Sequence, residues 1–111
     1  MTVKIYSFGL NTPDSVPPGD VVVIDVRHLR NPHSVAKLRS LDGRHPDVQA
    51  FVRADPRFEE VLRNGLMQAA HQRDIAFRCL GGRHRSVTLA EVVHSTLKLA
   101  GVCATVEHRC L

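Results

Sequence analysis

The sequence predicts one small α/β domain, over residues 1–111, with a mainly parallel sheet and helices on both faces. Short apolar runs typical of strands alternate with longer segments of helical periodicity. Residues 21–24 are continuously apolar, as in a central strand that is covered on both faces. A chain of 111 residues is long enough to bury its own hydrophobic core.

The first half of the chain contains two expected strands, over residues 2–8 and 20–26. Gly9 ends the first strand, and the proline-rich residues 10–19 form a loop. Residues 28–45 are polar and irregular, and a loop of this length favours a functional role. Two helices follow over residues 46–54 and 56–70, each with a proline in its first turn.

The second half contains a strand over residues 74–80, the longest helix over residues 84–100 and a last strand over residues 103–108. The long helix carries apolar residues on one face and ends before Gly101. Because ligands in parallel α/β domains bind beyond the carboxyl ends of the strands, we expect the functional site at that edge of the sheet.

Residues 79–86, Cys-Leu-Gly-Gly-Arg-His-Arg-Ser, form the segment that we call the glycine corner. Two adjacent glycines let the backbone approach a ligand and adopt positive φ. The helix that begins near His84 adds unpaired N–H groups and the positive end of its dipole. We therefore predict that this corner binds a phosphate or phosphate ester. The alternative is an ordinary strand–turn–helix junction with cationic residues on its rim.

Other polar residues are expected at the same edge of the sheet. Asp25 and Arg27 end the second strand, Asn31 and His33 follow on the long loop, and His108 ends the last strand. These side chains could bind the hydroxyl groups or an amine of the ligand. Asp25 has a structural alternative, in which it pairs with an arginine. The candidate ligand-binding residues are Asp25, Arg27, Asn31, His33, Leu80, Gly81, Gly82, Arg83, His84, Arg85, Ser86 and His108.

Cys79 and Arg85 also have the Cys-x5-Arg spacing of the cysteine phosphatases, followed by Ser86. In that hypothesis a Cys79 thiolate attacks phosphorus, and Asp25 is the candidate general acid. We favour the alternative that Cys79 is a small apolar residue at the end of a buried strand. A metal site formed by histidines and Cys79 is disfavoured, because the neighbouring arginines repel cations. We therefore expect no metal and no other cofactor.

The chain has a net charge of +4, with 12 arginines and 3 lysines. Arginine suits phosphate groups and stacking on bases, so the charge is compatible with RNA binding, although a bias in composition would also produce it. Three cysteines cannot all pair, so we expect free thiols and a cytoplasmic location. No apolar run has the length of a membrane span, so no membrane partner is expected.

Several motifs resemble the C-terminal domain of the RapZ family of bacterial RNase adapter proteins. They are Ser7-Phe8-Gly9, Asp25-Val26-Arg27 with Asn31-Pro32-His33, the glycine corner, and His108-Arg109, in the same order over nearly the whole chain. The resemblance implies a sugar-phosphate-binding module similar in shape to a phosphofructokinase subdomain. It further implies that the domain senses glucosamine-6-phosphate, binds a regulatory small RNA and assembles into oligomers.

The sequence also departs from the pattern of the family. It has no Gly-x-x-x-x-Gly-Lys-Ser/Thr motif, so we expect no hydrolysis of ATP or GTP. Leu80 replaces the usual threonine after the motif cysteine, and Asn11-Thr12-Pro13 replaces a basic Lys-His-Gly segment. These changes bear on RNA binding and on the identity of the sugar more than on the phosphate site. We expect a stand-alone regulatory binding domain, with the cysteine phosphatase as the alternative.

Overall fold

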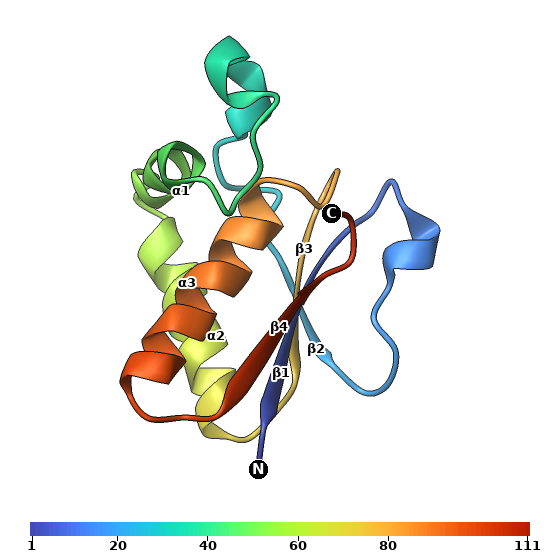
Figure 1. Ribbon diagram of the computed structural model, residues 1–111, viewed down its shortest axis with the longest axis vertical. Helices are drawn as coiled ribbons and strands as arrows, with labels where there is room; N and C mark the ends of the chain where they lie inside the picture. The colour runs from blue at the N-terminus through green and yellow to red at the C-terminus, as the bar shows by residue number, and fades with distance from the viewer.

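A computed structural model describes all residues from Met1 to Leu111 (Figure 1). It contains a four-stranded parallel sheet in the order β2-β3-β1-β4, three α-helices and three 3-10 turns. The α/β class and the predicted order of strands and helices are confirmed. In chain order the elements are β1 (Val3–Gly9), η1 (Pro13–Ser15), β2 (Val22–Asp25), η2 (Pro32–Ser34), η3 (Ala36–Leu38), α1 (Pro46–Arg53), α2 (Phe58–Ala70), β3 (Ile75–Cys79), α3 (Arg85–Leu99) and β4 (Ala104–His108).

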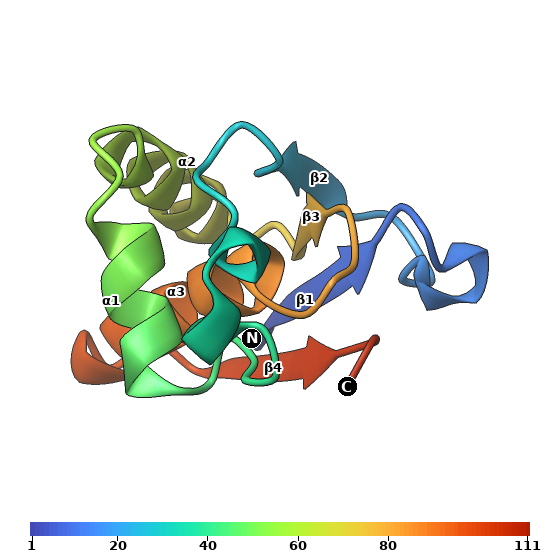
Figure 2. The ribbon, with the colours of Figure 1, turned by 90° about the horizontal axis from the view of Figure 1, so that it is seen from above.

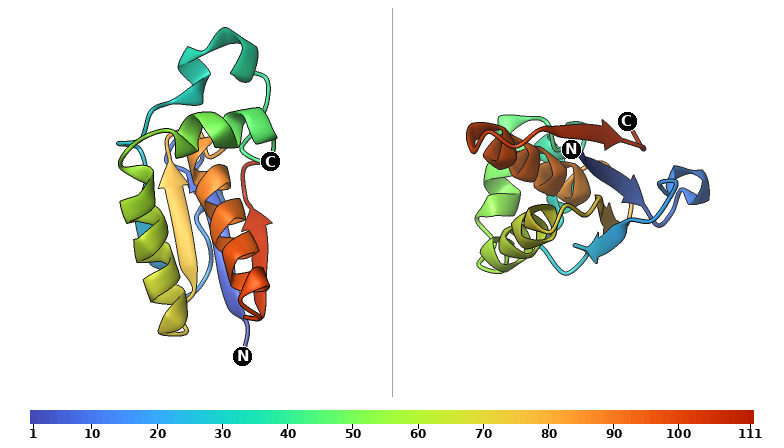
Figure 3. Two further views of the ribbon diagram at one scale, coloured as in Figure 1. Left: turned by 90° about the vertical axis from the view of Figure 1, so that its left-hand side faces the viewer. Right: turned by 90° about the horizontal axis from the view of Figure 1, so that it is seen from below.

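The expectation of helices on both faces of the sheet is wrong, because all three helices lie on one face (Figures 2 and 3). The connections from β2 to β3 and from β3 to β4 step across the sheet in the same direction. Right-handed crossovers therefore bring their helices to the same side. The connection from β1 to β2 steps the other way and contains only the short turn η1, so no α-helix covers the opposite face.

The position of β2 also differs from the prediction of a central strand. It is an edge strand that pairs only with β3, and Val23 is 44% exposed. Its continuous apolar run arises because Val22 and Ile24 face the helices while Val23 faces the open side.

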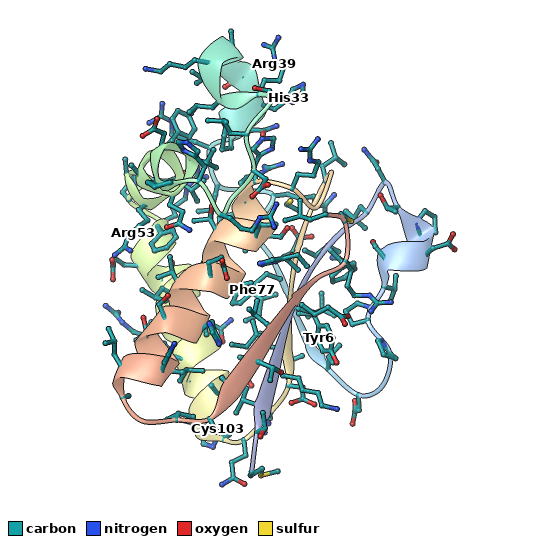
Figure 4. All side chains as sticks on the ribbon, in the orientation of Figure 1. Tyr6, His33, Arg39, Arg53, Phe77 and Cys103 are labelled. Carbon is teal, nitrogen blue, oxygen red and sulfur yellow. The ribbon has the colours of Figure 1, made fainter.

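Two hydrophobic clusters of unequal size lie on the two faces of the sheet. The large core lies between the sheet and the helices, and it includes Ile75, Phe77 and Val93. The small cluster on the other face contains Tyr6, Phe8 and Ala76. Figure 4 shows Phe77 and Tyr6 on these opposite sides. No helix has both the length and the apolar character needed to cross a bilayer.

The buried carboxylate of Asp55 fixes one end of the long loop that follows β2. Asp55 accepts the backbone N–H of Arg30 at 2.9 Å and the side chain of Arg57 at 2.8 Å. The hydrogen bonds from the Arg57 side chain hold the pKa of the Asp55 carboxyl well below its ordinary value of 3.8, although burial alone would raise it. Asp55 thus joins the loop to the junction between α1 and α2.

We expect Asp55→Asn to lower the free energy of unfolding at pH 7 by about 2 kcal/mol, because charge-assisted hydrogen bonds to a buried group are lost. Since the folded-state pKa is depressed, this stabilisation is complete above pH 3.8 and disappears as the pH falls toward the folded value. Urea denaturation at pH 7 and pH 3 measures both effects. Asp20→Asn, at an exposed position, is the matched control. An equal stability of variant and wild type at pH 7 would contradict this assignment.

Candidate functional site

The two glycines of the corner have different structural roles. Gly82 has a positive φ of 71°, and a Cβ at this position would lie 2.6 Å from the Sγ of Cys110 and 2.7 Å from the backbone N of Gly9. Gly82 therefore lets the corner pack closely against the end of β1. A Cβ on Gly81 would have no atom within 4 Å. Gly81 is the glycine that faces open space.

The backbone N–H groups of the corner are largely free of protein acceptors. The N–H of Gly82 donates to the Sγ of Cys79 at 3.3 Å. The N–H groups of Gly81, Arg83, His84, Arg85 and Ser86 donate to no group of the protein. Three of these amides, those of His84, Arg85 and Ser86, belong to the beginning of α3, where the first turn of a helix always leaves donors unpaired. The dipole of this 15-residue helix adds positive potential in the same place.

A cleft of about 310 Å³ opens over the corner. Its lining contains three arginines, two histidines and two asparagines, but no carboxylate. The lining residues are Asn11, Asn31, His33, Arg39, Cys79, Leu80, Gly81, Arg83, His84 and Arg85. The structure thus brings together seven of the twelve predicted site residues: Asn31, His33, Leu80, Gly81, Arg83, His84 and Arg85.

The two histidines of the cleft face each other. Their ring centroids lie 6.3 Å apart in an edge-to-face arrangement, with His33 on the projecting η2 segment (Figure 4). His84 is 8% exposed, and its Nε2 is buried without a hydrogen-bond partner. Burial lowers the pKa of His84 below 6.5, and the charge of Arg83 lowers it further. His84 is therefore neutral at pH 7 in the absence of a ligand.

Two arginines of the corner differ in their freedom to reach an anion. Arg83 is exposed and makes no hydrogen bond or ion pair through its side chain. Arg85 is only 6% exposed, and its Nη1 donates to the carbonyl oxygens of Arg27 at 2.6 Å and Leu29 at 3.2 Å. Arg85 contributes positive charge to the cleft while also tying the loop after β2 to the start of α3.

Asp25 and Arg27 lie outside the cleft. Asp25 is level with Arg78 in the sheet and faces the side without helices. Its carboxylate accepts the Nε of Arg27 at 2.9 Å and the Nη2 of Arg78 at 2.8 Å. Burial would raise the pKa of Asp25, but these arginines outweigh it and lower the pKa to about 2. The structural alternative for Asp25 is therefore the arrangement observed.

Three further predicted residues do not line the cleft either. Gly82 is enclosed by packing, as described above, and Ser86 is fully buried with its Oγ accepting the thiol of Cys79 at 3.1 Å. His108 bonds through Nδ1 to the Oγ of Ser7 at 2.7 Å, and its Nε2 lies 3.5 Å from the carboxylate of Glu91. Gly82 and Ser86 are thus packed within the corner, whereas His108 contacts β1 and α3.

Two cleft residues, Asn11 and Arg39, were not predicted from the sequence. The N–H of Asn11 donates to the carbonyl of Leu80, which extends the pairing of β1 and β3 toward the cleft. Its place just beyond the carboxyl end of a strand was a usable signal. Arg39 lies after η3 on the long loop, where only the length and polarity of the loop pointed to function.

No group of three or more histidine, cysteine or acidic side chains is arranged to hold a metal ion. His108 and the pair of His33 and His84 belong to different parts of the site. The polar groups that line the cleft are therefore amides, guanidinium groups and imidazoles.

The family model of the RapZ C-terminal domain matches the sequence of this chain over residues 1–111. A protein of Acidiphilium cryptum is 38% identical over 122 residues, covering 100% of this chain and 40% of the relative. A protein of Novosphingobium aromaticivorans is 40% identical, covering 97% of this chain and 38% of the relative. A protein of Geobacter metallireducens is 38% identical, covering 98% and 41%.

Each of these relatives is named a nucleotide-binding protein. The chain spans about two fifths of their length. The match of the family model to the whole chain agrees with the resemblance that the motifs indicated. The chain belongs to the RapZ C-terminal domain family.

Proposed function

We propose that this domain binds a phosphorylated small molecule, with the phosphate at the beginning of α3. The observation that carries the proposal is the set of unpaired N–H groups at Gly81 and residues 83–85, which line a cleft that contains no carboxylate. Such amides, with the helix dipole, are a common site for phosphate. The relatives named as nucleotide-binding proteins support a ligand that carries phosphate.

The remainder of the ligand is a sugar or a similar polar metabolite. Asn31 uses its Oδ1 to accept the N–H of His33 at 3.1 Å, which leaves its side-chain NH₂ available to the cleft. Asn11 supplies a second amide. These neutral groups suit hydroxyls. The resemblance to the family makes glucosamine-6-phosphate one ligand to test, and a regulatory role in the cytoplasm follows from it as a prediction.

Binding of RNA and assembly into oligomers are further predictions from the resemblance. The projecting loop exposes Arg27, Arg30, Lys37 and Arg39, which suits contact with a phosphate backbone. A gel shift with RNA over a series of salt concentrations tests RNA binding. Binding without a clear decrease at higher salt would contradict contacts to the phosphate backbone.

The cysteine phosphatase is the less favoured alternative. In its favour, the Sγ of Cys79 bonds to the Oγ of Ser86 and to the N–H of Gly82, at the beginning of a helix. Against it, Cys79 is 2% exposed and Arg85 is directed to backbone carbonyls. Asp25 faces the other side of the sheet and is ion-paired, so it is not available as a general acid.

We expect Gly81→Asp to weaken binding of glucose 6-phosphate at least about tenfold, because it adds a negative charge where the phosphate binds. The position has open space, so the fold should tolerate the side chain. Gly81→Asn is the matched control, with nearly the same size and no charge. Titration calorimetry measures both. If both variants lost the same affinity for glucose 6-phosphate, the effect would be steric, and the assignment of the anion site would be rejected.

We expect Cys79→Ser to keep its affinity for sugar phosphates, because the thiol is not proposed to contact the ligand covalently. We also expect the wild type to show no cysteine-dependent hydrolysis of p-nitrophenyl phosphate. Calorimetry and a colorimetric assay measure the two properties. Hydrolysis by the wild type that disappears in Cys79→Ser would favour the phosphatase instead.

A further inference from the structure

We propose that the cleft takes up a proton when it binds an anion, through the pair of imidazoles formed by His33 and His84. This inference rests on the proposed function, since the anion is the one assigned to the amides of the glycine corner. It adds a regulation of that site, because the affinity for a phosphorylated ligand then increases as the pH falls toward the range in which histidines titrate.

The first observation is that the pair lies at the proposed anion site, because His84 belongs to both. The backbone N–H of His84 is one of the unpaired amides, and the residue is the N-cap of α3. Its side chain lines the cleft together with that of His33, and the two ring centroids are 6.3 Å apart. A negative charge held at these amides therefore acts on both imidazoles, and the low exposure of His84 reduces the screening by water.

The second observation is that the protein supplies no negative charge to stabilise an imidazolium in the cleft. No carboxylate lines the cleft, whereas three arginines without an ion pair do: Arg39, Arg83 and Arg85. Asp42 is the only carboxylate of the loop over residues 28–45, and it is ion-paired with Arg44 at 2.8 Å. The remaining titratable group is the thiol of Cys79, which is 2% exposed. The counter-charge for a protonated imidazole must therefore come from a ligand.

These surroundings determine the sign of the effect. Burial lowers the pKa of His84 below its ordinary value of 6.5, and the charges of Arg83 and His33 lower it further, although the carbonyls of Leu38 and Leu41 oppose them. A bound phosphate dianion favours the protonated form of an imidazole that faces it. The complex therefore binds one proton more tightly than the free protein does, and by linkage the affinity for the dianion increases as the pH falls. The two rings are close enough to titrate as one pair.

Calorimetry in buffers of different ionisation enthalpy measures the number of protons taken up when glucose 6-phosphate binds. At pH 7.5 this ligand is a dianion, since the second pKa of a phosphate ester is about 6. We expect an uptake of at least about 0.3 proton per bound ligand at pH 7.5. We also expect the affinity at pH 7 to be at least about threefold higher than at pH 8.5.

The double variant His33→Gln with His84→Gln should abolish the uptake, because an amide side chain cannot take the proton. His71→Gln is the matched control, since His71 is exposed and lies after α2 at the other end of the sheet. Glucosamine 6-phosphate should give the same difference between wild type and double variant, because titration of the ligand's own groups cancels in this comparison.

Nitrogen NMR of the imidazole rings in the wild type gives a second measurement that needs no variant. At pH 7 the ring nitrogens of His33, His84 or both should move toward the values of an imidazolium when the sugar phosphate is added. If a sugar phosphate binds without uptake of protons or change in these rings, or if the double variant keeps the uptake, this inference is wrong and the proposed function stands. If neither glucose 6-phosphate nor glucosamine 6-phosphate binds to the wild type, both are wrong.

Discussion

The close approach of two backbone segments, at Gly9 and Gly82, is the constraint on which the site depends. A Cβ on Gly9 would lie 2.8 Å from the backbone N of Gly82, and a Cβ on Gly82 would lie 2.7 Å from the backbone N of Gly9. Only two glycines allow this contact. Gly82 is enclosed here, whereas Gly81 faces open space and lines the cleft together with the residues at the beginning of α3.

The side of the cleft formed by the long loop, with Asn31, His33 and Arg39, depends on three separate attachments of that loop. Near its start, Arg85 donates to the carbonyls of Arg27 and Leu29, and Asp55 accepts the N–H of Arg30. Near its end, the N–H of Gly43 donates to the carbonyl of Arg83 at 2.8 Å. Two of these attachments involve residues of the glycine corner itself. The corner that we propose as the anion site therefore also positions the loop that completes the cleft.

The arginine of the Cys-x5-Arg motif has a different role here from its role in the cysteine phosphatases. In a cysteine phosphatase this arginine holds the phosphate, whereas here the guanidinium of Arg85 is largely buried and binds backbone carbonyls. The thiol of Cys79 is correspondingly enclosed by Gly82 and Ser86. The geometry thus favours recognition of a phosphate by backbone amides and by free side chains such as Arg83.

The sequence by itself determined the α/β class, the strands and helices, and the glycine corner, because apolar periodicity and adjacent glycines act locally. Tertiary structure decided which face the helices cover, since that depends on the order of strands in the sheet. It also decided that Asp25 faces away from the cleft, because β2 is an edge strand on which alternate residues face opposite sides. Finally, it brought Asn11 and Arg39 to the cleft, since residues far apart in sequence meet only when the loops are anchored by the folded core.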